Sequence, residues 1–78
     1  MVTMKEILAN IAKAIVENPE DVVVTEHVEN GTVYLELSVN ENDMGKVIGK
    51  QGRIAKAIRT VMKVAAMRED MRVVVDII

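Results

Sequence analysis

Two glycines three residues apart, Gly49 and Gly52, enclose a basic and a polar side chain in the second half of the chain. The enclosed residues are Lys50 and Gln51, and Arg53 follows directly. Glycine lets the backbone approach a ligand closely, and the free N–H groups at the start of a helix attract anions. The pattern therefore predicts a loop that contacts phosphate groups, although two glycines around two polar residues also occur in ordinary turns.

A row of basic residues continues from this loop into the segment that follows it. Its members are Lys46, Lys50, Arg53, Lys56, Arg59 and Lys63. We expect Lys46, Lys50 and Arg53, which are nearest the loop, to contact phosphate. We expect Lys56 to reach the same nucleic-acid strand. Lys63 and Arg68 lie further along and are expected only to solvate the outer face of a helix.

The charge of the chain is divided unevenly along its length. The formal net charge is −2, which by itself argues against a nucleic-acid binder. Residues 1–43, however, hold two basic and nine acidic side chains, whereas residues 44–78 hold eight basic and three acidic ones. Such a division favours one surface for a polyanion and another that repels it. A solvated surface whose charges happen to segregate is the alternative.

Several functional classes are excluded by what the sequence lacks. Phe and Trp are absent and Tyr34 is the single aromatic residue, so base stacking on an aromatic platform, as in an RRM or an OB-fold, is excluded. The segment before Gln51 has the wrong spacing for a Walker A motif and lacks its Ser or Thr. There is no cysteine, His27 is the single histidine, and no nucleophile–base pair or metal-loop spacing is visible. We therefore expect neither an enzyme, nor a metal site, nor a cofactor.

An aliphatic groove is the remaining way for such a chain to hold bases. The residues available for it are Val47, Ile48, Ile54 and Ile58, together with Leu35 or Leu37 from a neighbouring strand. The same residues also suit a hydrophobic core, in which case only the edges of one or two would face a ligand.

The first half of the chain predicts a helix followed by a β-hairpin. Thr3 and Glu6 match a capping box, and apolar residues then recur at helical spacing until Pro19, whose preceding residue is pushed out of the helical region. Residues 22–28 and 32–39 are rich in β-branched or alternating apolar residues, and an Asn-Gly turn joins them.

The second half predicts a short helix, a long helix and a closing strand. A polar break at residues 40–43 precedes a helix over 44–48, and the glycine loop separates it from a helix over 53–68. Residues 71–78 form the closing strand. The order is α-β-β-α-α-β, and the fold class is α+β, with helices packed on one face of a three-stranded sheet and the other face open to water.

The periodicity also predicts which side chains are buried. In the long helix the expected core stripe consists of Ile54, Ala57, Ile58, Val61, Val64 and Ala65. In the strands the expected inward residues are Val33, Leu35, Leu37, Val39, Val73, Val75 and Ile77. Met62, Ala66 and Met67 would then lie beside the core stripe, where Met-rich edges suit adaptable contacts with a partner.

The run from Asp43 to Thr60, within this element order, resembles type II KH domains and is similar to the small bacterial single-KH proteins of the KhpA (YlqC) family. The resemblance covers the whole chain and implies one KH domain over residues 1–78. It implies RNA binding, with about four unpaired nucleotides held across the loop and an aliphatic groove. The residues that the resemblance assigns to the site are Gly49, Lys50, Gln51 and Gly52 as the backbone clamp, with Ile48 and Ile54 at the groove.

The resemblance also implies a cellular role and partners. Members of the family act as RNA chaperones or post-transcriptional regulators, and they pair with themselves or with a larger KH-containing protein, known as KhpB, Jag or EloR. We therefore predict a cytoplasmic, non-enzymatic protein that binds single-stranded RNA and forms a homodimer or such a heterodimer, with no membrane segment. The alternatives are a protein-interaction module with weak RNA contact, and a binder of single-stranded DNA.

Overall fold

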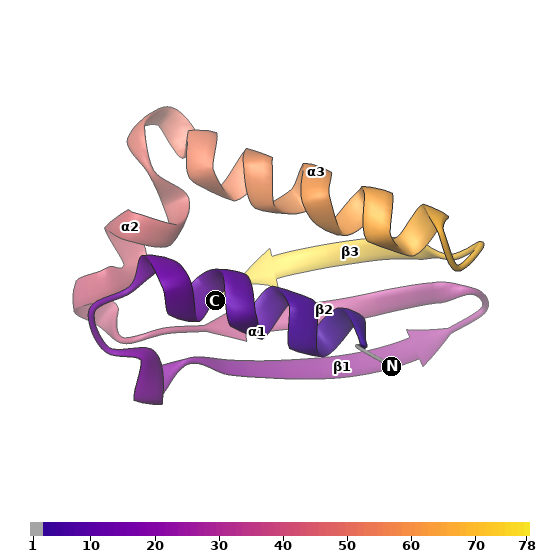
Figure 1. Ribbon diagram of the computed structural model, residues 1–78, viewed down its shortest axis with the longest axis horizontal. Helices are drawn as coiled ribbons and strands as arrows, with labels where there is room; N and C mark the ends of the chain where they lie inside the picture. Colours follow the sequence, from indigo (N-terminus) through magenta and orange to yellow (C-terminus); the bar gives the residue numbers. More distant parts are fainter. Residues whose placement is uncertain (1–2) are drawn as a thin grey trace.

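The computed structural model describes residues 3–78 and has the predicted order of elements (Figure 1). The helices and strands are α1 (Met4–Ile15), β1 (Val23–Glu29), β2 (Thr32–Ser38), α2 (Met44–Ile48), α3 (Arg53–Met67) and β3 (Arg72–Ile77). Short 3-10 turns at Pro19–Asp21, Glu41–Asp43 and Lys50–Gly52 join some of them. The α-β-β-α-α-β order confirms the predicted α+β class, with α1 and α3 lying across the same face of the sheet (Figure 1).

The three strands form a mixed sheet in the order β1-β2-β3. β1 and β2 are antiparallel, and β2 and β3 are parallel. Asn30 and Gly31 join β1 to β2 with φ values of 51° and 76°. Two consecutive positive φ angles are what a tight two-residue hairpin turn requires, so the predicted Asn-Gly turn is confirmed. Because β2 is central, β3 lies at an edge of the sheet, beside α3.

The hydrophobic core lies between the sheet and the two long helices. The alternation predicted for β2 is confirmed, because Val33, Leu35 and Leu37 are all at most 1% exposed. Leu8 of α1 and Met62 of α3, both completely buried, belong to the same cluster. Burial of one such side chain stabilises a fold by about 1.5–3 kcal/mol, so this cluster is what holds the helices on the sheet.

The core stripe predicted for α3 is wrong by about one residue in phase. The buried residues are Ala55, Ile58, Met62 and Ala66, whereas Val61 and Val64 are 49% and 50% exposed. Both stripes are apolar and have helical spacing, so periodicity alone could not choose between them. Packing of α3 with the distant segments of the core decides which stripe is buried. Met62 and Ala66 are therefore core residues and cannot form a partner surface.

The first helix is capped as expected but is shorter than the sequence suggests. The Thr3 hydroxyl accepts a hydrogen bond from the Glu6 N–H at 3.2 Å, which confirms the N-cap. The helix ends at Ile15, where the next residue, Val16, adopts extended dihedrals, three residues before Pro19. The segment after Ile15 is therefore extended, and the N–H groups of residues 17 and 18 contact Asp43 at the start of α2.

Candidate nucleic-acid interface

The glycine loop between α2 and α3 depends on backbone conformations that only glycine adopts easily. Gly49 has φ 75° and ψ 176°, and Gly52 has φ 74° and ψ 14°. The Gly49 N–H donates to the Gly45 carbonyl at 2.8 Å and ends α2, and the Gly52 N–H donates to the Gly49 carbonyl at 3.1 Å. Side chains at either position would be strained, so both glycines are needed for the chain to turn sharply from α2 into α3.

Gln51 sits between these glycines in the left-handed region, with φ 58° and ψ 25°. This conformation costs a residue with a side chain about 1 kcal/mol relative to glycine. Gln51 is exposed, and its Oε1 accepts a hydrogen bond from an Arg53 Nη2 at 3.3 Å. Lys50, beside it, is also exposed. The loop therefore presents a lysine, an amide and a guanidinium outward from one tight turn.

The two isoleucines predicted at the groove flank the loop and remain partly accessible. Ile48 and Ile54 are each 38% exposed. Ile54 packs directly over Gly49, because a Cβ at that glycine would come within 2.8 Å of the Ile54 Cβ. Ile54 thus packs against the backbone of the loop at Gly49, while part of its side chain remains exposed to solvent.

The start of α3 lacks the usual acceptors for its first N–H groups. Gly52 is the N-cap residue and has no side chain to accept a hydrogen bond, and the first turn of α3 holds no acidic residue. The N-terminal end of a helix carries a partial positive charge that attracts anions. With Lys50 and Arg53 beside it, this end of α3 is suited to a phosphate group.

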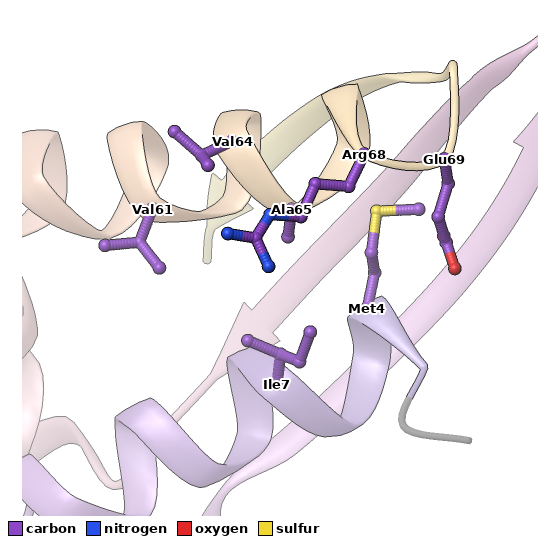
Figure 2. A pocket seen from close by; sticks show the side chains of 7 residues that line it. All are labelled: Met4, Ile7, Val61, Val64, Ala65, Arg68 and Glu69. Carbon is purple, nitrogen blue, oxygen red and sulfur yellow. The ribbon is translucent and has the colours of Figure 1, made fainter.

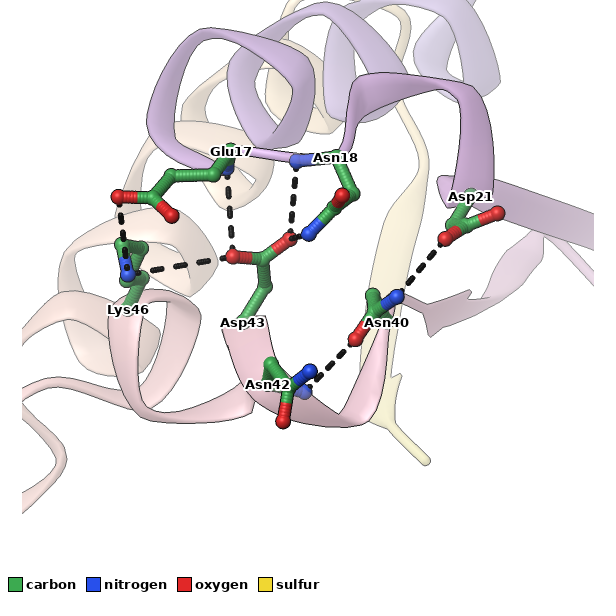
Figure 3. Close-up of polar contacts among 7 residues, drawn as sticks. All are labelled: Glu17, Asn18, Asp21, Asn40, Asn42, Asp43 and Lys46. Atoms are coloured by element: carbon green, nitrogen blue, oxygen red, sulfur yellow. Dashed lines mark hydrogen bonds and ion pairs between the residues drawn. The ribbon is translucent and has the colours of Figure 1, made fainter.

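Lys46, which the sequence analysis also assigned to phosphate, lies against carboxylates (Figure 3). Its Nζ is 3.7 Å from Glu17 Oε1 and 3.9 Å from Asp43 Oδ1. The Lys46 side chain remains 41% exposed. Its charge is thus partly neutralised within the protein, in contrast to the outward charges of Lys50 and Arg53.

The buried carboxylate of Asp43 ties the end of α1 to the start of α2 (Figure 3). Asp43 is 1% exposed and accepts hydrogen bonds from the Glu17 N–H at 3.2 Å and from the Asn18 N–H and Nδ2, both at 3.0 Å. Burial acts to raise the pKa of Asp43, but the Asn18 side chain, these two N–H groups and the charge of Lys46 outweigh it. The pKa therefore lies below the usual value of 3.8.

The structure places four of the residues proposed for an aliphatic groove in the core instead. They are Leu35, Leu37, Val47 and Ile58, each at most 3% exposed. A groove with a volume of about 650 Å³ lies instead between α3 and the edge strand β3. Its lining residues are Arg59, Lys63, Met67, Met71, Arg72, Val73, Val74, Val75 and Asp76. We call it the α3–β3 groove.

Sequence reasoning missed this groove because it took the neighbouring strand to be β2. The parallel pairing that sets β3 outside β2 is a long-range contact with no local signal. The basic flank of α3, however, was visible in the sequence, since Arg59 and Lys63 were part of the predicted row. The structure brings these two residues into the lining of the groove, while Lys50 and Arg53 stay at the loop.

A second hollow lies on the opposite flank of α3, between α3 and α1 (Figure 2). It has a volume of about 370 Å³ and is lined by Met4, Ile7, Val61, Val64, Ala65, Arg68 and Glu69. The exposed valines of α3 contribute to its wall, the Arg68 side chain extends into the space between α3 and α1, and Glu69 lies beside Met4 (Figure 2). We call it the α1–α3 hollow.

Residues 3–78 contain neither a cluster of side chains suited to a metal ion nor a helix suited to span a membrane. Between residues 3 and 78, no three His, Asp or Glu side chains are grouped so that they could hold a metal ion. In the same part of the chain, no helix has the length and apolar character needed to cross a membrane.

The chain is similar in sequence to bacterial proteins named for RNA binding. The sequence model of the family described as KhpA/KhpB, KH domain, matches residues 5–77. RNA-binding protein KhpA of Clostridium perfringens is 60% identical over 75 residues, which cover 96% of this chain and all of that relative. RNA-binding protein KhpA of Listeria monocytogenes is 45% identical over 96% of this chain and 99% of its own length.

Two solved structures of the protein Era share the fold. Era from Aquifex aeolicus, bound to GDP and aluminium fluoride, matches with a TM-score of 0.68 and 20% identity. Era in complex with nucleotides 1506–1542 of 16S ribosomal RNA matches with a TM-score of 0.67 and 20% identity. Each match covers 95% of this chain but only 29% and 28% of the Era chain, so the likeness extends to one part of Era and shows the fold alone.

The steric requirement at Gly49 can be tested with a matched pair of glycine variants. Gly49→Ala should lower the midpoint of thermal unfolding by several degrees, because the new Cβ meets Ile54 and the φ angle is positive. Gly45→Ala is the control, since nothing lies within 4 Å of its Cβ and the residue is helical. Circular dichroism melts that show equal midpoints for the two variants would contradict the tight packing of the loop on Ile54.

The Asp43 network predicts how stability depends on pH. Because the folded-state pKa of Asp43 is lowered, its contribution to stability is complete above pH about 4 and is lost as the pH falls through the folded-state pKa. Urea unfolding from pH 7 to pH 2 should therefore show Asp43→Asn less stable than the wild type at neutral pH, with the difference shrinking in acid. A stability difference that stays constant over this range would rule out the charged network.

Proposed function

The chain belongs to the KhpA/KhpB KH-domain family, and we propose that it binds single-stranded RNA without acting as an enzyme. The observation that carries this proposal is the loop from Gly49 to Gly52, where three residues with positive φ turn Lys50, Gln51 and Arg53 outward at the uncapped start of α3. The relatives' name, RNA-binding protein KhpA, supports the same conclusion.

The RNA backbone would lie against the glycine loop. The absence of a Cβ at Gly49 and Gly52 lets a phosphodiester come close to the main chain, and the helix end adds its partial charge. Lys50 and Arg53 would neutralise the phosphates that lie there, and Lys56, exposed one turn along α3, would reach the next phosphate. Lys46 would act indirectly, by masking the negative charges of Glu17 and Asp43 that would otherwise repel the RNA.

The bases would enter the α3–β3 groove. Its wall is formed by aliphatic and methionine side chains with cationic residues at the rim, so it can accept unpaired bases by shape and edge contacts. Unpaired bases are required, because a groove between a helix and a strand edge leaves no room for a duplex. We propose further that the chain acts as one cytoplasmic KH domain whose role is that of an RNA chaperone or post-transcriptional regulator.

RNA binding through the loop can be tested by fluorescence anisotropy with a pool of short unstructured RNAs. The double variant Lys50→Asp with Gln51→Asp should bind at least about ten-fold more weakly than the wild type, because two new carboxylates repel phosphate at the clamp. If Lys50, Arg53 and Lys56 neutralise three phosphates, the log–log salt dependence of wild-type binding should have a slope of about −2. Matched DNA oligomers, tested in parallel, separate RNA binding from binding of any single strand.

The control for this experiment changes the same charge on another surface. Asn10→Asp with Lys13→Asp places the same net change of −3 on exposed positions of α1. This variant should bind RNA within about two-fold of the wild type, once circular dichroism has shown both variants to be folded. Equal loss of affinity in the two variants would mean that overall charge, not the loop, governs binding.

A second candidate function, self-association, is favoured by the apolar flank of α3. Ile54, Val61 and Val64 are 38%, 49% and 50% exposed and, with Ala57, form one stripe along the side of the helix that faces α1. We call it the exposed stripe. It replaces the surface of Met62, Ala66 and Met67 expected from the sequence, of which Met62 and Ala66 are buried.

The shape and charge of this flank fit a second copy of the same chain. Ile54 projects at one end of the exposed stripe, and the α1–α3 hollow, whose lining on α3 starts at Val61, begins about 10 Å further along the helix. Two α3 helices that pair antiparallel about Val61 would seat each Ile54 at the other copy's hollow. The same pairing sets Arg53 beside the partner's Glu69, so opposite charges meet at both ends. A two-fold pair of this kind closes on itself and forms no larger assembly.

Sedimentation equilibrium over a range of protein concentrations tests this pairing. Val64→Asp should weaken self-association by at least about ten-fold, because it places a charge in an apolar contact. Val23→Asp on β1 is the matched control, as Val23 is 53% exposed but far from α3 in the sheet. Arg53→Glu should weaken association and Glu69→Arg should restore it in the double variant. A wild type that stays monomeric at high concentration would contradict self-association.

A further inference from the structure

The backbone of β3 presents hydrogen-bonding groups to the α3–β3 groove. β3 pairs with β2 along one side, where the N–H groups of Arg72 and Ile78 donate at 3.0 and 2.9 Å. Hydrogen-bonding groups point to opposite sides at successive residues of a strand. Those of Val73, Val75 and Ile77 therefore point away from β2, and Val73 and Val75 are among the residues that line the groove beside α3.

One of these groups is already engaged within the protein. Arg59 reaches across from α3, and its Nε donates to the Val75 carbonyl at 3.1 Å in a partly buried contact. Both residues line the groove. A guanidinium carries five N–H donors in a rigid fork, so four remain after this bond. At this point of the β3 edge, the N–H of Val75, a residue that is 5% exposed, lies beside further donors of Arg59, in place of a donor beside an acceptor.

This difference decides which base edges can pair with the strand. A free N–H and C=O of one residue would match an edge that has an acceptor beside an amino donor, as adenine presents with N1 and its N6 amino group. Two neighbouring donors match an edge with two neighbouring acceptors, as cytosine presents with N3 and O2. An adenine in this position would leave its amino group facing a donor, and an unmatched polar group on binding is costly.

We propose that Arg59 sets the base preference of the groove, favouring cytosine over adenine in a single strand by occupying the Val75 carbonyl. The proposal rests on the RNA binding proposed above and deepens it by assigning a specificity-determining residue. Arg59 is one of three cations in the lining, with Lys63 and Arg72, but it is the one whose guanidinium is bonded to the strand edge. Its role is thus distinct from general attraction of phosphate.

Binding of cytidine and adenosine octamers, measured by fluorescence anisotropy at one salt concentration, tests the proposal. The wild type should bind the cytidine octamer about three- to ten-fold more tightly, the effect of one hydrogen bond gained or lost. Arg59→Met keeps the apolar stem but removes the guanidinium, which frees the Val75 carbonyl. This variant should lose the preference for cytidine, because a free N–H and C=O match N3 and the amino group of cytosine as well as N1 and the amino group of adenine. Because stacking within the adenosine octamer is the same for every variant, the ratio of the two affinities can be compared directly.

Lys63→Met is the matched control, because it removes one positive charge from the same groove without touching the strand edge. It should weaken binding of both octamers by the same factor and leave their ratio unchanged. A parallel loss for both octamers in Arg59→Met, as in Lys63→Met, would overturn the proposal and reduce Arg59 to a phosphate contact. A wild type that prefers adenosine would also overturn it.

The failure of this proposal can be told apart from failure of RNA binding itself. If the loop variant Lys50→Asp with Gln51→Asp loses binding but the Arg59→Met ratio does not change, RNA binding stands and the role of Arg59 falls. If the wild type binds neither octamer, both fall. Solvent exchange of the Arg59 Nε proton, followed by NMR in the free protein, gives a readout without RNA. Exchange as fast as in Arg53, whose side chain is exposed, would overturn the bond to Val75.

Discussion

The burial of one stripe of α3 in the hydrophobic core between the helices and the sheet is the interaction on which the rest of the structure depends. Ala55, Ile58, Met62 and Ala66 face the core, and this rotation of the helix determines what each of its flanks meets. Its basic flank is turned toward the edge strand β3, and its apolar flank toward α1. A rotation by one residue would bury valines in place of Met62, and both the α3–β3 groove and the exposed stripe would disappear.

The glycine loop is held in place by contacts in both of the helices that it joins, α2 and α3. On the α2 side, Asp43 joins the segment after α1 to the start of α2 through three hydrogen bonds. Gly49 is the C-cap residue of the short helix α2. On the α3 side, Ile54 packs on Gly49 at the beginning of the helix. The loop is therefore held between two helices that are each anchored to the rest of the fold. A strained residue such as Gln51 can persist in this setting because its neighbours leave the backbone no alternative path.

The two flanks of α3 separate two kinds of contact. Polar and charged groups lie at the loop and along the α3–β3 groove, where a phosphodiester and its bases would need them. Exposed valines and Ile54 lie along the other flank, beside the α1–α3 hollow. Since the flanks do not overlap, a second copy of the chain on one flank would leave the groove on the other flank open. Ile54 and Arg53 stand where the two surfaces meet, at the loop, so any coupling between them would pass through these residues.

The sequence by itself determined those features that depend on neighbouring residues. The Thr3 cap, the Asn30-Gly31 turn, the alternation of β2 and the Gly49–Gly52 loop each follow from residue types at fixed short spacings, and each is found in the structure. Only the tertiary structure decided the face that α3 buries, the engagement of Lys46 by Glu17, and the contact of Arg59 with Val75. These features join residues 16 to 29 positions apart, or choose between two apolar stripes of one helix. The physical reason is that local spacing specifies dihedral angles and periodicity, whereas burial and partner choice depend on how distant segments pack together.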